Sequence, residues 1–83
     1  MSIEVTVKLF AVYQEAYGKP EIQLTFPESV PVEAVLDRVL QEKPELAQWR
    51  EVTRFGLNLQ FVAQDVLIHH GDEIVLIPPV SGG

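Results

Sequence analysis

The sequence predicts an α+β fold in which strands from both ends of the chain form a mixed sheet and one main helix packs across it. Two segments near the start alternate apolar and polar residues, and one segment between two prolines carries apolar residues at helical spacing. A run of apolar, mostly β-branched residues follows near the end. Two strands, one helix and then several strands favour α+β over a repeated βαβ fold. With 83 residues there is room for a single domain, residues 1–83.

The first two strands are predicted from strict alternation. Residues 3–9 alternate between apolar and polar side chains, and residues 21–26 do so again before Pro27. This pattern is typical of a strand with one buried face. Between them, residues 11–17 suit a short helical turn that ends at Gly18, because glycine readily adopts the left-handed conformation at a helix C-terminus. The two strands are therefore expected to pair antiparallel.

The main helix is predicted to begin at Pro31, because the missing N–H of proline costs nothing in a first turn. Pro44 is expected to end it. Residues 45–51 are expected to form a further short helical piece, with Leu46 and Trp49 packed against the core. Apolar residues at intervals of three and four form one stripe of the main helix, which faces the sheet. They are Val32, Val35, Leu36, Val39 and Leu40.

The last third of the chain is rich in strand signals. Residues 54–59 and 61–62 are predicted strands, with a turn at or just after Asn58, and residues 69–72 form a polar turn. Residues 73–77 are a dense apolar run, which predicts a strand buried on both faces. A strand pair, a helix across the sheet and a final central strand describe the β-grasp architecture.

Composition and charge exclude several functions. Twelve acidic and six basic residues give a formal net charge of −6, so the chain lacks the basic stripe that binds nucleic acid. The absence of cysteine excludes disulfides, thiolate nucleophiles and cysteine zinc sites. No apolar run approaches the roughly 20 residues of a membrane span, and no leader is recognised. We expect a cytoplasmic protein without nucleic-acid or membrane partners.

The body of the chain offers little catalytic chemistry. His69 and His70 invite a metal hypothesis, but adjacent side chains on an extended segment point to opposite faces. Gly56 and Gly71 stand alone instead of forming a phosphate-binding loop. We therefore expect neither a metal site nor a bound cofactor.

The end of the sequence is different, because it reads Pro78-Pro79-Val80-Ser81-Gly82-Gly83 directly after the last predicted strand. Prolines stiffen the exit by fixing φ, and glycines can enter a narrow channel. The unhindered carboxylate of Gly83 can attack the α-phosphate of ATP, and the resulting acyl-adenylate can accept sulfur to become a thiocarboxylate. The alternative is a frayed end with incidental glycines. These residues alone leave both interpretations open.

A family resemblance adds to this pattern. Leu57-Asn58, Gly71-Asp72-Glu73-Ile74 and the terminal Pro-Pro-Val-x-Gly-Gly together resemble the small subunit of molybdopterin synthase, a family of ubiquitin-like β-grasp sulfur carriers. Residues 7–11 and 31–35 also agree, so the likeness covers nearly the whole chain. The terminal segment is its most specific element. His69-His70 and Leu57 depart from the family pattern, which bears on partner identity more than on sulfur carriage.

The resemblance implies a sulfur carrier in molybdenum cofactor biosynthesis, the non-catalytic sulfur-donor subunit of a sulfurtransferase complex. An E1-like adenylating enzyme would consume ATP to activate Gly83, sulfur would convert it to a thiocarboxylate, and the tail would enter the large subunit of molybdopterin synthase. Residues 78–83 would then be an exposed, flexible reactive tail. Ser81 and Gly82 would be the residues that thread into the partner ahead of the reacting Gly83. The resemblance also implies an interface with the partners, formed by Phe10, Phe61, Ile77, Pro78, Pro79 and Val80.

Three alternatives share parts of this pattern. Sulfur carriers of thiamine biosynthesis and of tRNA thiolation have the same fold and the same Gly-Gly end. In a ubiquitin-like modifier, Gly83 would be joined to a lysine through an isopeptide bond. In a plain interaction domain, the terminal glycines would have no function. The double proline favours the molybdopterin carrier over the thiamine carriers, which usually lack it.

Overall fold

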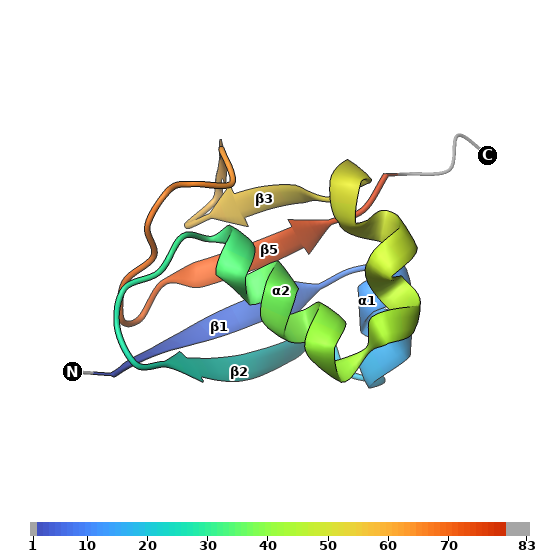
Figure 1. Cartoon of the computed structure of the whole chain (residues 1–83), viewed down its shortest axis with the longest axis horizontal. Helices are drawn as coiled ribbons and strands as arrows, with labels where there is room; N and C mark the ends of the chain where they lie inside the picture. The colour runs from blue at the N-terminus through green and yellow to red at the C-terminus, as the bar shows by residue number, and fades with distance from the viewer. Residues whose placement is uncertain (1, 80–83) are drawn as a thin grey trace.

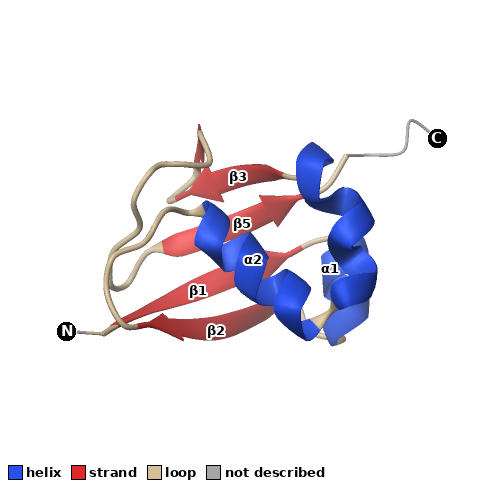
Figure 2. Ribbon diagram, in the orientation of Figure 1, coloured by secondary structure: helices blue, strands red, loops and turns tan. Residues whose placement is uncertain are grey.

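A five-stranded mixed sheet forms one layer of the protein, and the helices cover one of its faces (Figures 1 and 2). The computed structural model describes residues 2–79. The strand order is β2-β1-β5-β3-β4, so the last strand in the sequence is the central one. The strands are β1 (Ile3–Leu9), β2 (Glu21–Phe26), β3 (Arg54–Leu57), β4 (Gln60–Val62) and β5 (Glu73–Ile77). The helices are α1 (Val12–Tyr17), α2 (Glu33–Glu42) and the 3₁₀ helix η1 (Pro44–Val52).

The first and last strands pair directly in this sheet. Strand β1 runs parallel to β5, with Leu9 opposite Leu76, whereas the β1–β2, β3–β5 and β3–β4 pairs are antiparallel. The ends of β1 and β5 therefore lie at the same edge of the sheet. The α+β class, the mixed sheet and the central position of the last strand are confirmed.

Helix α2 lies across the sheet and supplies the centre of the core (Figure 1). Val35 and Val39 from its predicted stripe are fully buried, as are Ile74 and Leu76 of β5. Burying an aliphatic side chain of this size contributes roughly 1.5–3 kcal/mol. Leu46 of η1 is also buried, and Trp49 is half-buried against the core as expected.

The start of α2 differs from the prediction. The helix begins at Glu33, and Pro31 instead forms an isolated bridge with Leu67. The backbone N–H of Val32 donates to the carbonyl of Val66 across this bridge, at 2.8 Å. Because Pro31 pairs with the loop that precedes β5, the α-helix starts at Glu33, two residues later than the proline signal indicates.

Strand β5 is buried on one face only, so the prediction of burial on both faces is wrong. Ile74 and Leu76 point into the core, whereas Val75 and Ile77 are half-buried on the opposite face. The helices cover one side of the sheet in the described residues (Figure 2). The apolar residues on the other side are therefore open to solvent contact.

Strands β3 and β4 form a hairpin with a two-residue turn. The predicted strand 54–59 ends at Leu57, because Asn58 and Leu59 adopt positive φ angles of 49° and 73°. Two positive φ angles suit the right-handed twist of a hairpin, and Asn followed by Gly is the favoured pair. The Asn58 side chain also accepts a hydrogen bond from the Glu73 N–H at 3.0 Å, which ties the turn to the start of β5.

A buried polar chain joins α1 to the end of η1. The Tyr13 hydroxyl lies 2.5 Å from Thr53 Oγ1, and the Thr53 hydroxyl donates to the Trp49 carbonyl at 2.7 Å. Burial raises the pKa of Tyr13 above its ordinary value. Helix α1 ends at Gly18 in the left-handed conformation, as predicted. Within residues 2–79, none of the helices combines the length and apolar character that a membrane span requires.

The hairpin turn generates a stability prediction. Leu59 pays the cost of a left-handed backbone, roughly 1–2 kcal/mol for a residue with a Cβ, while its side chain is 90% exposed and packs little. Leu59→Gly is expected to raise the free energy of unfolding by about 0.5–1 kcal/mol, measured by urea denaturation. Leu59→Ala keeps the Cβ and should leave stability nearly unchanged. A glycine variant less stable than the alanine variant would contradict this account of the turn.

Candidate functional site

The face of the sheet that points away from α2 carries the candidate site. Phe61 of β4 lies opposite Gly56 of β3, Gly56 lies opposite Val75 of β5, and Val75 lies opposite Lys8 of β1. Residues directly opposite each other on paired strands share a face of the sheet. Lys8 lies opposite Glu21 of β2 in the same row. One half of the open face is therefore apolar and the other half is charged.

Phe61 stands between two shallow hollows on the apolar half. Its side chain is 74% exposed, which is unusual for a phenylalanine on a sheet. The smaller hollow has a volume of about 160 Å³, and Gly56 is one of its lining residues. A Cβ at Gly56 would lie only 3.3 Å from Val75 Cβ, so a larger residue would crowd this part of the sheet. Its lining residues are Gly56, Leu59, Gln60, Phe61, Val75 and Ile77.

The larger hollow, of about 580 Å³, adjoins the point where the described chain ends. The end of η1 forms one of its sides, and the end of β5 with the residues after it contributes another. It is lined by Glu51, Val52, Thr53, Arg54, Phe61, Ile77, Pro78 and Pro79. Phe61 and Ile77 line both hollows, so the open face is continuous from the hairpin to the chain exit.

The predicted interface residues are brought together only in part. Phe61 and Ile77 share both hollows, whereas Phe10 does not line either of them. Phe10 is nevertheless 52% exposed and directly follows β1, at the edge where β5 also ends. Pro79 is exposed, but Pro78 is buried, so the prediction that the exposed tail begins at residue 78 is wrong. The predicted reactive and threading residues Val80, Ser81, Gly82 and Gly83 lie outside the described residues.

Several residues of this face, among them Val75, Gly56, Leu59 and Arg54, were not predicted. Val75 lies two positions before Ile77, so strand alternation alone could have placed both on one face. Gly56 and Leu59 carry no pattern that points to a hollow, because their roles depend on the β3–β4 pairing. Arg54 lines the larger hollow, and its position follows from its register opposite Ile77.

The charged half of the open face carries an ion pair formed within the chain. Lys8 donates a hydrogen bond to Glu21 from Nζ to Oε1, and this bond together with the nearby carboxylate charge raises the pKa of Lys8. Both side chains remain partly exposed, so the pair contributes little to stability. Its effect is to fix a polar border beside the apolar half.

His69 and His70 belong to a polar turn at the other end of the sheet. His70 Nδ1 accepts a hydrogen bond from the Glu4 N–H at 3.0 Å, and the His69 N–H donates to Asp72 at 2.7 Å. Among residues 2–79, no three metal-binding side chains gather in one place. The histidines and Asp72 thus order the approach to β5 and lie apart from the apolar hollows.

The mixed sheet with parallel first and last strands, crossed by one helix, defines a ubiquitin-like β-grasp domain. A ubiquitin of Caldiarchaeum subterraneum has the same fold, with a TM-score of 0.68 at 19% identity over the full length of both chains. The open apolar face of this domain lies beside the point where the described chain ends.

The chain belongs to the ThiS family, which matches residues 7–83. A relative from Arabidopsis thaliana is named molybdopterin synthase sulfur carrier subunit; it is 33% identical over 82 residues, covering 99% of this chain and 85% of its own. A relative of the same name from Dictyostelium discoideum is 35% identical over 86 residues, covering both chains completely.

Two solved structures extend the comparison. One is a complex of subunits 1 and 2 of the molybdopterin-converting factor of Helicobacter pylori, 27% identical, with a TM-score of 0.65 over 98% of this chain and 100% of that one. The other is small archaeal modifier protein 1 of Methanosarcina acetivorans, 28% identical, with a TM-score of 0.77 over 100% of this chain and 99% of that one.

The position of Phe61 leads to a prediction about the fold. Phe61→Asp should change the free energy of unfolding by no more than about 0.5 kcal/mol, because the side chain is already exposed. Ile74→Asp places the same charge in the core, on the central strand β5, and should unfold the protein. Circular dichroism during urea denaturation measures both. Unfolding of the Phe61 variant would show that this ring supports the core.

Proposed function

We propose that this chain is the sulfur carrier subunit of molybdopterin synthase and that Gly83 carries the transferred sulfur as a C-terminal thiocarboxylate. The main support for this proposal is the similarity of nearly the whole chain to two proteins named molybdopterin synthase sulfur carrier subunit. The terminal Gly82-Gly83 supports it, because a glycine carboxylate is unhindered toward attack and toward entry into a narrow site.

The proposed chemistry takes place at one carboxylate. An ATP-dependent, E1-like adenylating partner joins a carboxylate oxygen of Gly83 to the α-phosphate of ATP and releases pyrophosphate. A sulfur nucleophile at the oxidation level of sulfide then attacks the carbonyl carbon and displaces AMP, which leaves the thiocarboxylate. The chain has no cysteine, so a thioester or persulfide on its own side chains is excluded. The folded part of the chain serves to present the carboxylate.

The large subunit of molybdopterin synthase is the proposed recipient of the tail. Support comes from the Helicobacter pylori structure, which is a complex of subunits 1 and 2. The apolar hollows around Phe61 give such a partner a contact surface next to the chain exit. The four residues after Pro79 reach at most about 14 Å when fully extended, so the site that receives the sulfur must lie close to this contact.

A ubiquitin-like protein modifier is the second candidate function. The full-length similarity to small archaeal modifier protein 1 favours it. In that case the activated Gly83 would form an isopeptide bond with a lysine, and covalent adducts would accumulate in place of free thiocarboxylate. Carriers of thiamine biosynthesis or tRNA thiolation would form the same thiocarboxylate but would not lose sulfur to a pterin precursor in the large subunit.

The test of the proposal changes the length of the tail. Adding one alanine after Gly83 converts the reacting carboxylate into an amide, so sulfur transfer should be abolished. Deleting Gly83 moves the carboxylate back by one residue, about 3.5 Å of extended chain, and should lower the rate a hundredfold or more. Gly83→Ala keeps the reach and should cause an intermediate loss. The stability of all three should equal that of the parent chain.

The assay combines each variant with the adenylating enzyme, ATP, a sulfur donor, the large subunit and the pterin precursor. Intact-mass analysis reports the exchange of one oxygen for sulfur at the chain end, and molybdopterin formation reports transfer. Full molybdopterin formation by the extended variant would refute sulfur carriage at Gly83. Adducts to lysine without thiocarboxylate would establish the modifier instead.

A further inference from the structure

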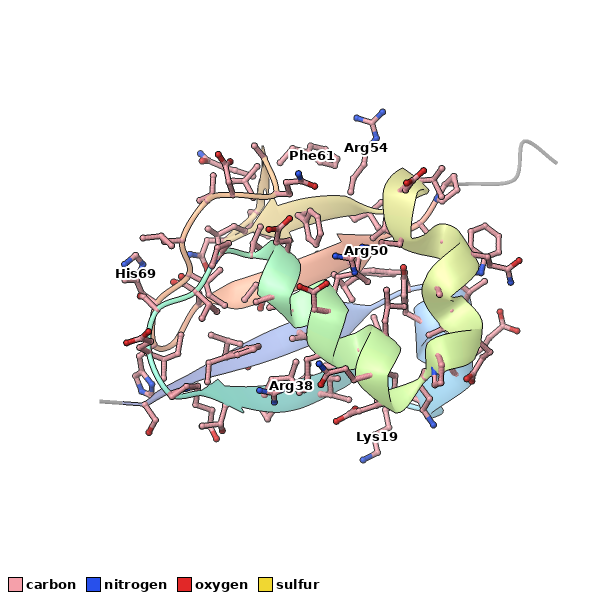
Figure 3. The ribbon with its side chains drawn as sticks, in the orientation of Figure 1. Lys19, Arg38, Arg50, Arg54, Phe61 and His69 are labelled. Atoms are coloured by element: carbon pink, nitrogen blue, oxygen red, sulfur yellow. The ribbon has the colours of Figure 1, made fainter. Side chains whose placement is uncertain are left out.

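Arg54 is a cation at the corner of the apolar half of the open face. It is the first residue of β3, lies opposite Ile77 in the register with β5, and is exposed. It lines the larger hollow together with Phe61 and Pro79. Figure 3 shows its guanidinium extending away from the sheet near Phe61, on the opposite side of the molecule from Lys19.

Other cations of the chain already have contacts within it. Lys8 pairs with Glu21, and Arg50 pairs with Asp37. Arg38 lies over the Phe26 ring at 4.6 Å from its centroid, and Lys43 lies over the Tyr17 ring at 5.2 Å. Arg54 and Lys19, in contrast, take part in no ion pair or cation–π contact formed within residues 2–79, and of these two only Arg54 lines the larger hollow.

We propose that Arg54 binds a carboxylate on the large subunit when that subunit covers the apolar half of the open face; this inference rests on the proposed function. An arginine beside an exposed aromatic ring is the composition of an interface hot spot. The planar guanidinium can bind a carboxylate through two parallel hydrogen bonds, which fixes orientation as well as charge. Docking removes water from the pair, and this strengthens the attraction when both charges are satisfied.

The larger hollow also defines where the acidic residue of the partner must lie. Glu51 lines the same hollow and carries the opposite charge. A partner carboxylate is therefore attracted toward Arg54 and repelled from Glu51. The matching surface of the large subunit therefore presents an apolar side chain that enters the hollow beside Phe61. It also presents an acidic side chain next to Arg54 and none next to Glu51.

The test compares two charge reversals that alter net charge equally. Arg54→Glu and Lys19→Glu each replace one positive charge by one negative charge, which changes the formal net charge from −6 to −8. Lys19 is exposed near the start of β2, away from the apolar hollows. Binding of each full-length variant to the purified large subunit from the same organism is measured by surface plasmon resonance at low and high salt.

We expect Arg54→Glu to weaken binding at least about tenfold more than Lys19→Glu, because only Arg54 loses a direct partner. This difference should shrink as salt rises. Arg54→Lys should retain only part of the affinity, because the ammonium keeps the charge but cannot form two parallel hydrogen bonds to a carboxylate. Arg54→Gln removes the charge without adding a repulsion and should give a smaller loss of the same kind. Circular dichroism confirms that each variant is folded.

Equal losses for Arg54→Glu and Lys19→Glu would overturn the proposal, because the effect would then be one of net charge. Binding of Arg54→Gln that equals that of the parent chain at low salt would overturn it as well. If the parent chain itself does not bind the large subunit, the proposed function fails and this inference fails with it. The parent control therefore distinguishes the two failures.

Discussion

The parallel pairing of β1 with β5 is the interaction on which the rest of the structure depends. It joins the two ends of the chain at the centre of the sheet, so that neither half can form its hydrophobic layer without the other. Val7 and Ile74 are opposite each other in this pair and both are fully buried. The chain therefore leaves the fold from its central strand, which is among the last parts of a domain to open.

The one-sided cover of the sheet separates stability from recognition. Helix α2 and its neighbours seal one face, and residues there are buried to fill a core. On the opposite face Phe61 is exposed. Gly56 of the same face has no side chain to fill the space beside Phe61 and Val75. An exposed apolar patch of this kind favours aggregation in a free protein. Such patches are typical of surfaces that another protein covers. The face continues as far as Pro79, where the described chain ends.

Sequence patterns predicted the parts of this fold that rest on local rules. Alternation located β1 and β2, and the helical stripe identified Val35 and Val39 as core. The start of α2 could not be predicted, because the bridge between Pro31 and Leu67 joins segments far apart in the sequence.

The open face of the sheet was hard to predict for a different reason. The face of β5 that carries Val75 and Ile77 cannot be told from core in the sequence, because a half-buried apolar residue on an open face and a fully buried one are of the same residue types. Phe61 and Ile77 were predicted as interface residues from the family resemblance. The positions of Gly56 and Arg54 on the same face follow only from the strand register, which the sequence does not show.

The burial of Pro78 has a consequence for the kinetics of any reaction at the chain end. Because Pro78 is held by the fold, a partner docked beside Pro79 meets the group at the chain end as part of the same molecule instead of by diffusion. A reacting group joined to a bound domain by a short segment has an effective concentration in the millimolar range or above, independent of the amount of protein in solution.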